Sequence, residues 1–244
     1  MVPKTAKSQS SMSRNRNNPN FPYLEADDFF QFPPVENADD GLVATGGNLS
    51  PGMLHSAYLQ GIFPWFNEDS PILWWSPDPR FVLFPNELHI PQSLQKVLKK
   101  NTFTYTIDTC FESVIKGCAK SKRPEQSGTW ITGDMIDAYC KLHKEGLAHS
   151  IEAWRNGKLA GGFYGVLIGS VFFGESMFTI EPNASKAAFC SFVKSFEAAG
   201  GKMIDSQIYT DHIARFGGRN ISRNAFLHYE KEYLSMPLTD KIKL

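Results

Sequence analysis

Three polar side chains stand out because they lie within segments that otherwise have the composition of apolar strands. Glu175 lies between phenylalanines in FFGESMF, and Asp205 and Gln207 are two residues apart in MIDSQIY. A carboxylate among apolar neighbours is costly without a partner, and residues i and i+2 of a strand point to one face of a sheet. We expect Glu175 to hold an ammonium or guanidinium group, and Gln207 to align a nucleophile with Asp205 behind it. The structural alternative is that Glu175 pairs with a lysine and Asp205 caps a neighbouring backbone.

A second candidate feature is a cluster of aromatic residues. The segment GIFPWFNEDSPILWWSPDPR, residues 61–80, contains three tryptophans and two phenylalanines among four prolines. Four prolines exclude a long helix or a central strand. These rings therefore either cover a core from an irregular segment or line a pocket for a flat or apolar ligand.

Other common kinds of site are disfavoured by the sequence. The four cysteines form no CxxC pair and lie in segments predicted to be helical, and the six histidines show no HExxH spacing. Reduced thiols in a cytosolic protein explain the cysteines better than a zinc site or a disulfide framework. We expect no metal and no cofactor.

Charge is unevenly spread although the formal net charge is zero. Residues 1–20 hold four basic and no acidic side chains, whereas residues 21–50 hold six acidic and no basic ones. Lys96, Lys99 and Lys100 are spaced i, i+3, i+4, which places them on one face of a predicted helix. That face is either a solvated stripe or a phosphate contact. No apolar run reaches the ~18 residues of a membrane span, and the polar N-terminus lacks the apolar centre of a secretory signal.

The elements that must position these residues follow from periodicity and turn signals. Helices are expected at 51–60, with Ser50 as N-cap and Pro51 at the first position, and at 91–100, with a strand at 80–84 between them. From residue 103 the expected order is β-α-α-β-β-β-α-β-α, with a hairpin at Asn156-Gly157. This order gives a mixed sheet with helices on both faces, and it resembles the GNAT acyltransferase fold. The glycine-rich turn that a coenzyme A donor needs is missing, because the relevant segment is TIEPNASKAAF.

Seven motifs together resemble the leucyl/phenylalanyl-tRNA–protein transferase family. GIFPWF, PILWWSPDPR, GTWIT, HSIEAW, GESMF, NASK and IDSQ occur in the family's order and approximate spacing between residues 31 and 234. The resemblance implies an α/β (α+β) fold with a small N-terminal domain leaning on a GNAT-like domain. The implied divisions are a basic disordered tail at 1–20, the N-terminal domain at 21–80, the catalytic domain at 81–234 and a C-terminal tail at 235–244.

The resemblance also implies an activity. Family members move leucine or phenylalanine from aminoacyl-tRNA to the α-amino group of proteins that begin with arginine or lysine, and the new residue marks these proteins for degradation. Ester aminolysis of this kind needs no ATP, metal or covalent intermediate. We expect a cytoplasmic monomer that does not bind membranes, with modest leakage toward methionine because one methylene is worth only ~1–3 kcal/mol.

The family pattern assigns individual residues in this sequence. Gln207 accepts a hydrogen bond from the attacking amine, Asp205 polarises that amide, and Glu175 binds the basic N-terminal residue. The lysine face touches the tRNA acceptor end, although Gln92 stands where the family has arginine. The implied lining of the aminoacyl pocket is Trp65, Trp130, Phe163, Phe172, Phe192 and Ile204.

Two departures from the family pattern bear on these assignments. Phe163 replaces a methionine of the pocket, which alters its expected size, and Ser206 replaces a common cysteine, which argues against a nucleophile there. Two other functions are compatible with the same residues. One is a GNAT-like enzyme with another acyl donor, and the other is a non-catalytic adaptor that binds basic N-termini through Glu175.

Overall fold

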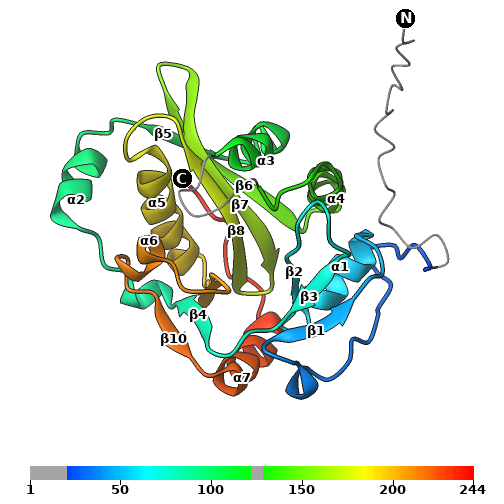
Figure 1. Cartoon of the computed structure of the whole chain (residues 1–244). Coiled ribbons are helices and arrows are strands. Elements are labelled where there is room, and N and C mark those ends of the chain that lie inside the picture. Colours follow the sequence, from blue (N-terminus) through cyan, green and yellow to red (C-terminus); the bar gives the residue numbers. More distant parts are fainter. Residues whose placement is uncertain (1–20, 122–128) are drawn as a thin grey trace, which may run out of the picture.

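The computed structural model describes residues 21–121 and 129–244, so the expected tail at 1–20 lies outside the described residues. This part of the chain folds around two β-sheets (Figure 1). A three-stranded sheet forms between Leu42 and Trp75, and a seven-stranded sheet forms between Arg80 and Ile221. Many of the functional residues predicted above lie in the large sheet or directly beside a strand of one of the two sheets.

The small sheet fixes the aromatic segment in place. Its antiparallel order is β1-β3-β2, with β1 at Leu42–Thr45, β2 at Phe63–Pro64 and β3 at Leu73–Trp75. Trp74 is buried, and the indole N–H of Trp75 donates to the carbonyl of Trp65 at 2.7 Å. Helix α1, Pro51–Tyr58, follows Ser50 with a proline at its first position, as predicted.

The large sheet has the order β10-β4-β9-β8-β7-β6-β5. Its only parallel pair among the described strands is β8 with β9, so the sheet is mixed and the expected α/β architecture is confirmed. The strand bounds are β4 Arg80–Leu83, β5 Thr104–Ile107, β6 Ala148–Arg155, β7 Lys158–Ile168, β8 Val171–Thr179, β9 Met203–Asp205 and β10 Arg219–Ile221.

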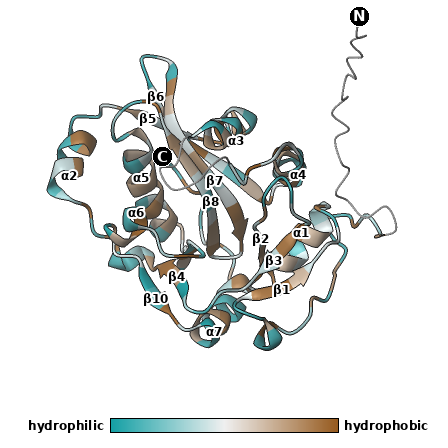
Figure 2. Cartoon of the chain, viewed as in Figure 1, coloured by the Kyte–Doolittle hydropathy of each residue, from teal (hydrophilic) through white to brown (hydrophobic). Residues whose placement is uncertain are grey.

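Helices cover both faces of this sheet. Helices α3 and α4 share one apolar cluster with α1 and the small sheet, whereas α2, α5 and α6 share a second cluster on the other face. Hydrophobic residues run along the central strands between these layers (Figure 2). The helical bounds are η1 Val35–Asn37, η2 Pro85–Glu87, α2 Gln92–Lys99, α3 Phe111–Lys120, α4 Gly133–Lys144, α5 Ala184–Ala198, α6 Asp211–Ala214 and α7 Arg223–Leu234.

Local sequence signals account for most of these boundaries. Thr132 caps α4, with its hydroxyl accepting from the backbone N–H of Met135. Asn156 and Gly157 both have positive φ in the β6–β7 turn, as the hairpin signal predicts. Helix α2 begins one residue later than predicted, because Pro91 is its N-cap rather than its first helical residue.

The sheet opens next to its parallel pair. Strand β9 follows β8 only as far as the pair of Phe173 with Asp205, and then β9 ends while β8 continues to Thr179. Beyond this point β8 pairs with β7 on one side and has no strand on its β9 side within the described chain. The opening leaves room beside β8, and Gln207 lies two residues after the end of β9 in the chain.

Candidate active site

A pocket of about 450 Å³ lies where the large sheet opens against the small sheet. Of the predicted aminoacyl-pocket residues, the structure brings five together in its lining: Trp65, Trp130, Phe163, Phe172 and Ile204. Phe192 does not line the pocket. It packs behind the wall, with its ring centroid 4.6 Å from that of Phe172 and 5.5 Å from that of Phe163.

Additional lining residues were not predicted from the sequence. Phe63 and Pro64 of the small sheet, Phe189 of α5, and His212 and Ile213 of α6 also face the pocket. Glu175 and Gln207 supply polar groups to a wall that is otherwise largely aromatic and aliphatic. A site of this composition selects an apolar group by shape and orients it by a few polar contacts.

Glu175 lines the pocket and is the extra residue of a β-bulge in β8. Tyr164 of β7 is opposite Ser176, and Gly165 is opposite Gly174, so Glu175 between them has no partner on β7. A bulge bends its strand and re-aims the side chain of the unpaired residue. The carboxyl group lies on the same face of β8 as Phe173, toward α1, α4 and the turn after β9.

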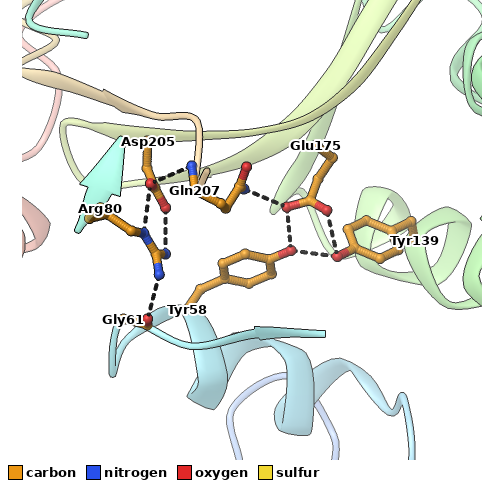
Figure 3. Close-up of polar contacts among 7 residues, drawn as sticks. All are labelled: Tyr58, Gly61, Arg80, Tyr139, Glu175, Asp205 and Gln207. Carbon is orange, nitrogen blue, oxygen red and sulfur yellow. Dashed lines mark hydrogen bonds and ion pairs between the residues drawn. The ribbon is translucent and has the colours of Figure 1, made fainter. Parts of the chain in front are cut away.

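Three donors surround the Glu175 carboxylate (Figure 3). The Tyr58 hydroxyl donates to one oxygen at 2.7 Å, and the Tyr139 hydroxyl donates to the other at 3.2 Å. The two phenol oxygens also lie within hydrogen-bond distance of each other, and because each hydroxyl has one proton, only two of these three oxygen–oxygen contacts are hydrogen bonds at a time while Glu175 is ionised. The third donor is the side-chain Nε2 of Gln207, at 3.2 Å.

Opposing effects place the pKa of Glu175 near neutral pH. Burial raises its pKa to about 7, while the two tyrosine hydrogen bonds act in the opposite direction. Burial and the neighbouring carboxylate raise the pKa values of Tyr58 and Tyr139 well above their ordinary range, so both remain protonated donors. The carboxyl group therefore changes charge near neutral pH, in contact with two donors that do not.

Asp205 lies behind the pocket wall in a buried ion pair with Arg80. The guanidinium Nε and Nη2 donate to the two carboxylate oxygens at 2.9 and 2.7 Å, and Nη1 donates to the carbonyl of Gly61 at 3.1 Å. Both side chains of the pair are almost completely buried. The guanidinium also lies over the rings of Phe63 and Phe226, 4.8 and 4.3 Å from their centroids.

This ion pair positions Gln207. One oxygen of Asp205 accepts the backbone N–H of Gln207 at 2.9 Å, and Gln207 has a left-handed φ of 57°. The prediction that both residues belong to one strand is wrong, because β9 ends at Asp205. The directions of the Asp205 and Gln207 side chains are therefore not explained by alternation along a strand. They are explained by the turn in which Asp205 accepts the backbone N–H of Gln207.

The orientation of the Gln207 amide follows from its partner. Its NH₂ group faces the Glu175 carboxylate, which can only accept when ionised. The amide oxygen then has no hydrogen-bond donor among residues 21–121 and 129–244, and it is available to a ligand in the pocket. A carboxylate and an amide oxygen are thus presented side by side, a combination suited to binding an amine.

The predicted lysine face is separate from this pocket. Lys96, Lys99 and Lys100 are exposed on α2 and at its C-cap, as expected. In the described part of the chain, no group of three or more His, Cys, Asp or Glu side chains could hold a metal ion. No helix between residues 21 and 121 or 129 and 244 is long and apolar enough to cross a bilayer.

Comparison with known proteins gives a consistent result. A sequence profile for leucyl/phenylalanyl-tRNA protein transferase matches residues 82–231, and one for the N-terminal domain of these transferases matches residues 47–78. A leucyl/phenylalanyl-tRNA–protein transferase from Anaeromyxobacter sp. (strain K) is 52% identical over 204 residues, covering 84% of this chain and 88% of that protein. One from Chromohalobacter salexigens is 50% identical over 214 residues, covering 86% and 83%.

Similarity to solved structures is weak. L-PGS from Bacillus licheniformis gives a TM-score of 0.38 at 10% identity, covering 70% of this chain and 58% of that one. A GCN5-related N-acetyltransferase from Kribbella flavida gives a TM-score of 0.34 at 10% identity, covering 71% and 62%.

Proposed function

The chain belongs to the leucyl/phenylalanyl-tRNA–protein transferase family, and from this premise we propose that its pocket transfers leucine or phenylalanine to N-terminal arginine or lysine. The enzyme is an aminoacyltransferase that moves an aminoacyl group from tRNA to protein. The observation that carries the finer proposal is the pairing of Glu175 with the Gln207 amide at the wall of an apolar pocket.

The proposed donor site is the aromatic part of the pocket. Trp65 and Trp130 come from different parts of the chain and enclose it together with Phe163, Phe172 and Ile204. A leucyl or phenylalanyl side chain gains roughly 1.5–3 kcal/mol from complete burial there, whereas a polar side chain would lose its hydration. Phe163 reduces the space that the family's methionine leaves, which favours leucine and phenylalanine over longer side chains.

The proposed acceptor site is the polar wall. The α-amino group of the acceptor donates to the amide oxygen of Gln207, and its basic side chain pairs with the Glu175 carboxylate. An α-amino group has a pKa of about 7.7–8.0, so an appreciable fraction is neutral near pH 7. Holding that neutral amine against the ester can contribute ~7–11 kcal/mol through orientation.

The reaction is aminolysis of an ester. The amine nitrogen attacks the carbonyl carbon, the new C–N bond forms, and the C–O bond to the terminal ribose breaks. The amine loses one proton and the departing ribose oxygen gains one, so the transfer is balanced without a metal, ATP or an enzyme-bound intermediate. A neutral amide is a weak base, so Gln207 acts by positioning, and a ribose hydroxyl of the tRNA relays the proton.

The lysine face of α2 completes the proposal. Lys96, Lys99 and Lys100 contact phosphates of the acceptor end, with an affinity that falls as salt rises. The modified protein is then a substrate for degradation in the cytoplasm, and the transferase acts as a monomer. We further propose that the boundary between the N-terminal and catalytic domains lies near residue 80.

A transfer assay tests the proposed function. Purified protein is incubated with [¹⁴C]Phe-tRNA and a peptide that begins with arginine, and incorporation into the peptide is measured. The same peptide with an acetylated N-terminus is the matched control and should receive no label. A protein that instead acetylates the peptide from acetyl-CoA, or that binds the peptide without any transfer, would contradict the proposal.

A further inference from the structure

Two cationic side chains stand one helical turn away from residues that line the pocket. Lys186 precedes Phe189 of α5 by three positions, and Arg215 follows His212 of α6 by three. Residues three apart on a helix are neighbours on one face. Lys186, which is half-buried, and Arg215, which is exposed, therefore lie at the rim of the pocket next to Phe189 and His212.

Within the described residues, no ion pair or side-chain hydrogen bond involves the Lys186 ammonium or the Arg215 guanidinium group. Of the acids nearest to them in sequence, Glu181 pairs with Arg155 at 2.6 Å. Asp211 keeps its charge while it accepts from the neutral Tyr209 hydroxyl at 2.7 Å, but it forms no ion pair with Arg215.

The charges of Lys186 and Arg215 affect a side chain that lines the pocket. The imidazole of His212 lines the pocket, and its pKa is lowered to about 4, first by burial and then by the charges of Lys186 and Arg215. His212 is consequently neutral at physiological pH. The positive potential at this edge comes from the lysine and the arginine.

The position and charge of Lys186 and Arg215 indicate which of the two substrates they contact. If the proposed function holds, an aminoacyl group in the pocket is esterified to the terminal ribose of tRNA, and the phosphate on that nucleoside lies at the mouth. An acceptor with a basic N-terminus would be repelled by two free cations. Lys186 is carried by α5, which packs against α2, and both helices share one apolar cluster with α6 (Figure 1).

We propose that Lys186 and Arg215 bind the phosphate linking the last two nucleotides of aminoacyl-tRNA. This inference rests on the proposed function, since it assigns a second part of the same donor to the pocket rim. The rim and the lysine face of α2 then form one cationic path along the single-stranded acceptor end. Glu175, on β8, is left to the basic acceptor.

Equilibrium binding of two unreactive donor analogues tests the proposal without turnover. Both carry phenylalanine on 3′-amino-3′-deoxyadenosine through an amide bond, and one of them also carries a 5′-phosphate. Wild-type protein should bind the phosphorylated analogue at least about tenfold more tightly, because a charged hydrogen bond contributes ~1.5–3 kcal/mol and 1.4 kcal/mol is tenfold. In the K186A/R215A variant the two dissociation constants should become equal within about twofold.

A matched control separates this contact from a general charge effect. Lys194 and Lys231 are exposed, and Lys194 lies eight residues beyond Lys186 on α5, about 12 Å along the helix axis. The K194A/K231A variant loses the same net charge and should keep the full preference for the phosphorylated analogue. Titrations at pH 8 keep His212 neutral in all three proteins.

Two results would overturn the inference. One is a wild-type protein that binds both analogues equally, and the other is a K186A/R215A variant that weakens both analogues to the same extent. Failure of the proposed function is distinguished by the transfer assay. A protein that transfers phenylalanine from tRNA but gains no affinity from the phosphate refutes the inference alone, whereas a protein that prefers the phosphorylated analogue but cannot transfer refutes the proposed function alone.

Discussion

At the scale of single residues, the proposed acceptor site depends on the charge of Glu175. Its pKa of about 7 reflects burial, partly offset by hydrogen bonds from Tyr58 and Tyr139. Only the carboxylate form attracts a basic N-terminal residue, so acceptor binding is expected to strengthen as pH rises through 7. The neutral fraction of the acceptor amine also rises over this range, because its pKa is about 7.7–8.0.

These two ionisations predict a distinctive pH profile. For wild-type enzyme, log(kcat/KM) for an Arg-starting peptide should rise with a slope near 2 below pH 6.5, because this parameter reports groups of the free enzyme and free substrate. Glu175→Gln should lower kcat/KM and leave a slope near 1, from the amine alone. A slope of 2 that persists in the variant would show that another group of the enzyme titrates.

Asp205 illustrates a residue that acts through its neighbours. Replacement by asparagine leaves the Arg80 guanidinium buried without its counter-charge, and breaking a buried ion pair in this way typically costs ~3–5 kcal/mol. The free energy of unfolding in urea should fall by about that amount in D205N. The Glu87→Gln variant is the matched control, because its pair with Arg219 is largely exposed and is worth less than ~1 kcal/mol. Equal, small losses in both variants would contradict a structural role for the buried pair.

Sequence reasoning found the polar residues of the site but not their partners. Glu175, Asp205 and Gln207 were visible because each is a polar group inside an apolar segment. Tyr58 and Tyr139 were missed because a buried tyrosine in a helix has the sequence signature of ordinary core packing. Arg80 was missed because the residue that it pairs with lies 125 positions away, and only the folded sheet brings β4 next to β9.

At the scale of elements, the bulge in β8 depends on the small residues around it. A Cβ on Gly165 would lie 2.2 Å from the carbonyl oxygen of Phe173 and 2.6 Å from the ring of Phe172. A Cβ on Gly174, directly opposite, would meet nothing closer than 3.7 Å. The two sides of the bulge therefore differ sharply in their tolerance of a methyl group.

This difference predicts unequal effects of two alanine substitutions. G165A should lower the free energy of unfolding by roughly 1–3 kcal/mol through overpacking, and should lower kcat/KM because both Phe172 and Glu175 are displaced. G174A should change stability by less than about 1 kcal/mol and should retain most activity. Urea denaturation and the transfer assay on both variants check this, and a harmless G165A would mean that the bulge is not rigidly held.

At the scale of elements, the regular helices and strands are predictable from the sequence and the bulge in β8 is not. Long strands and helices with strong periodicity were predicted, including the hairpin of β6 and β7. The bulge at Glu175 was not, since its neighbours are apolar on both sides and a one-residue change in register leaves no compositional trace. β2 and β10 are only two and three residues long and exist because a longer neighbour pairs with them.

At the scale of the whole molecule, the proposed function depends on two sheets meeting at one pocket. Trp65 directly follows β2 of the small sheet and Tyr58 ends α1, whereas Glu175 and Gln207 lie at the opening of the large sheet. The chain has no formal net charge, yet Lys96, Lys99 and Lys186 lie on α2 and α5 and Arg215 directly follows α6, whereas Glu175 lies on β8. This separation would allow the polyanionic donor and the basic acceptor to approach along different surfaces.

The lysine face supplies a prediction at this largest scale. Charge reversal at all three positions, K96E/K99E/K100E, should raise KM for Phe-tRNA with little change in kcat, and should reduce the salt dependence of binding by about two units of slope for three single-strand phosphate contacts. The K158E/K194E/K231E variant changes the net charge equally at exposed positions outside α2 and should behave as wild type. Transfer from phenylalanyl-adenosine, which has no phosphates to contact, should be unaffected by either triple variant. An unchanged KM for Phe-tRNA at physiological salt would show that the acceptor end follows another path to the pocket.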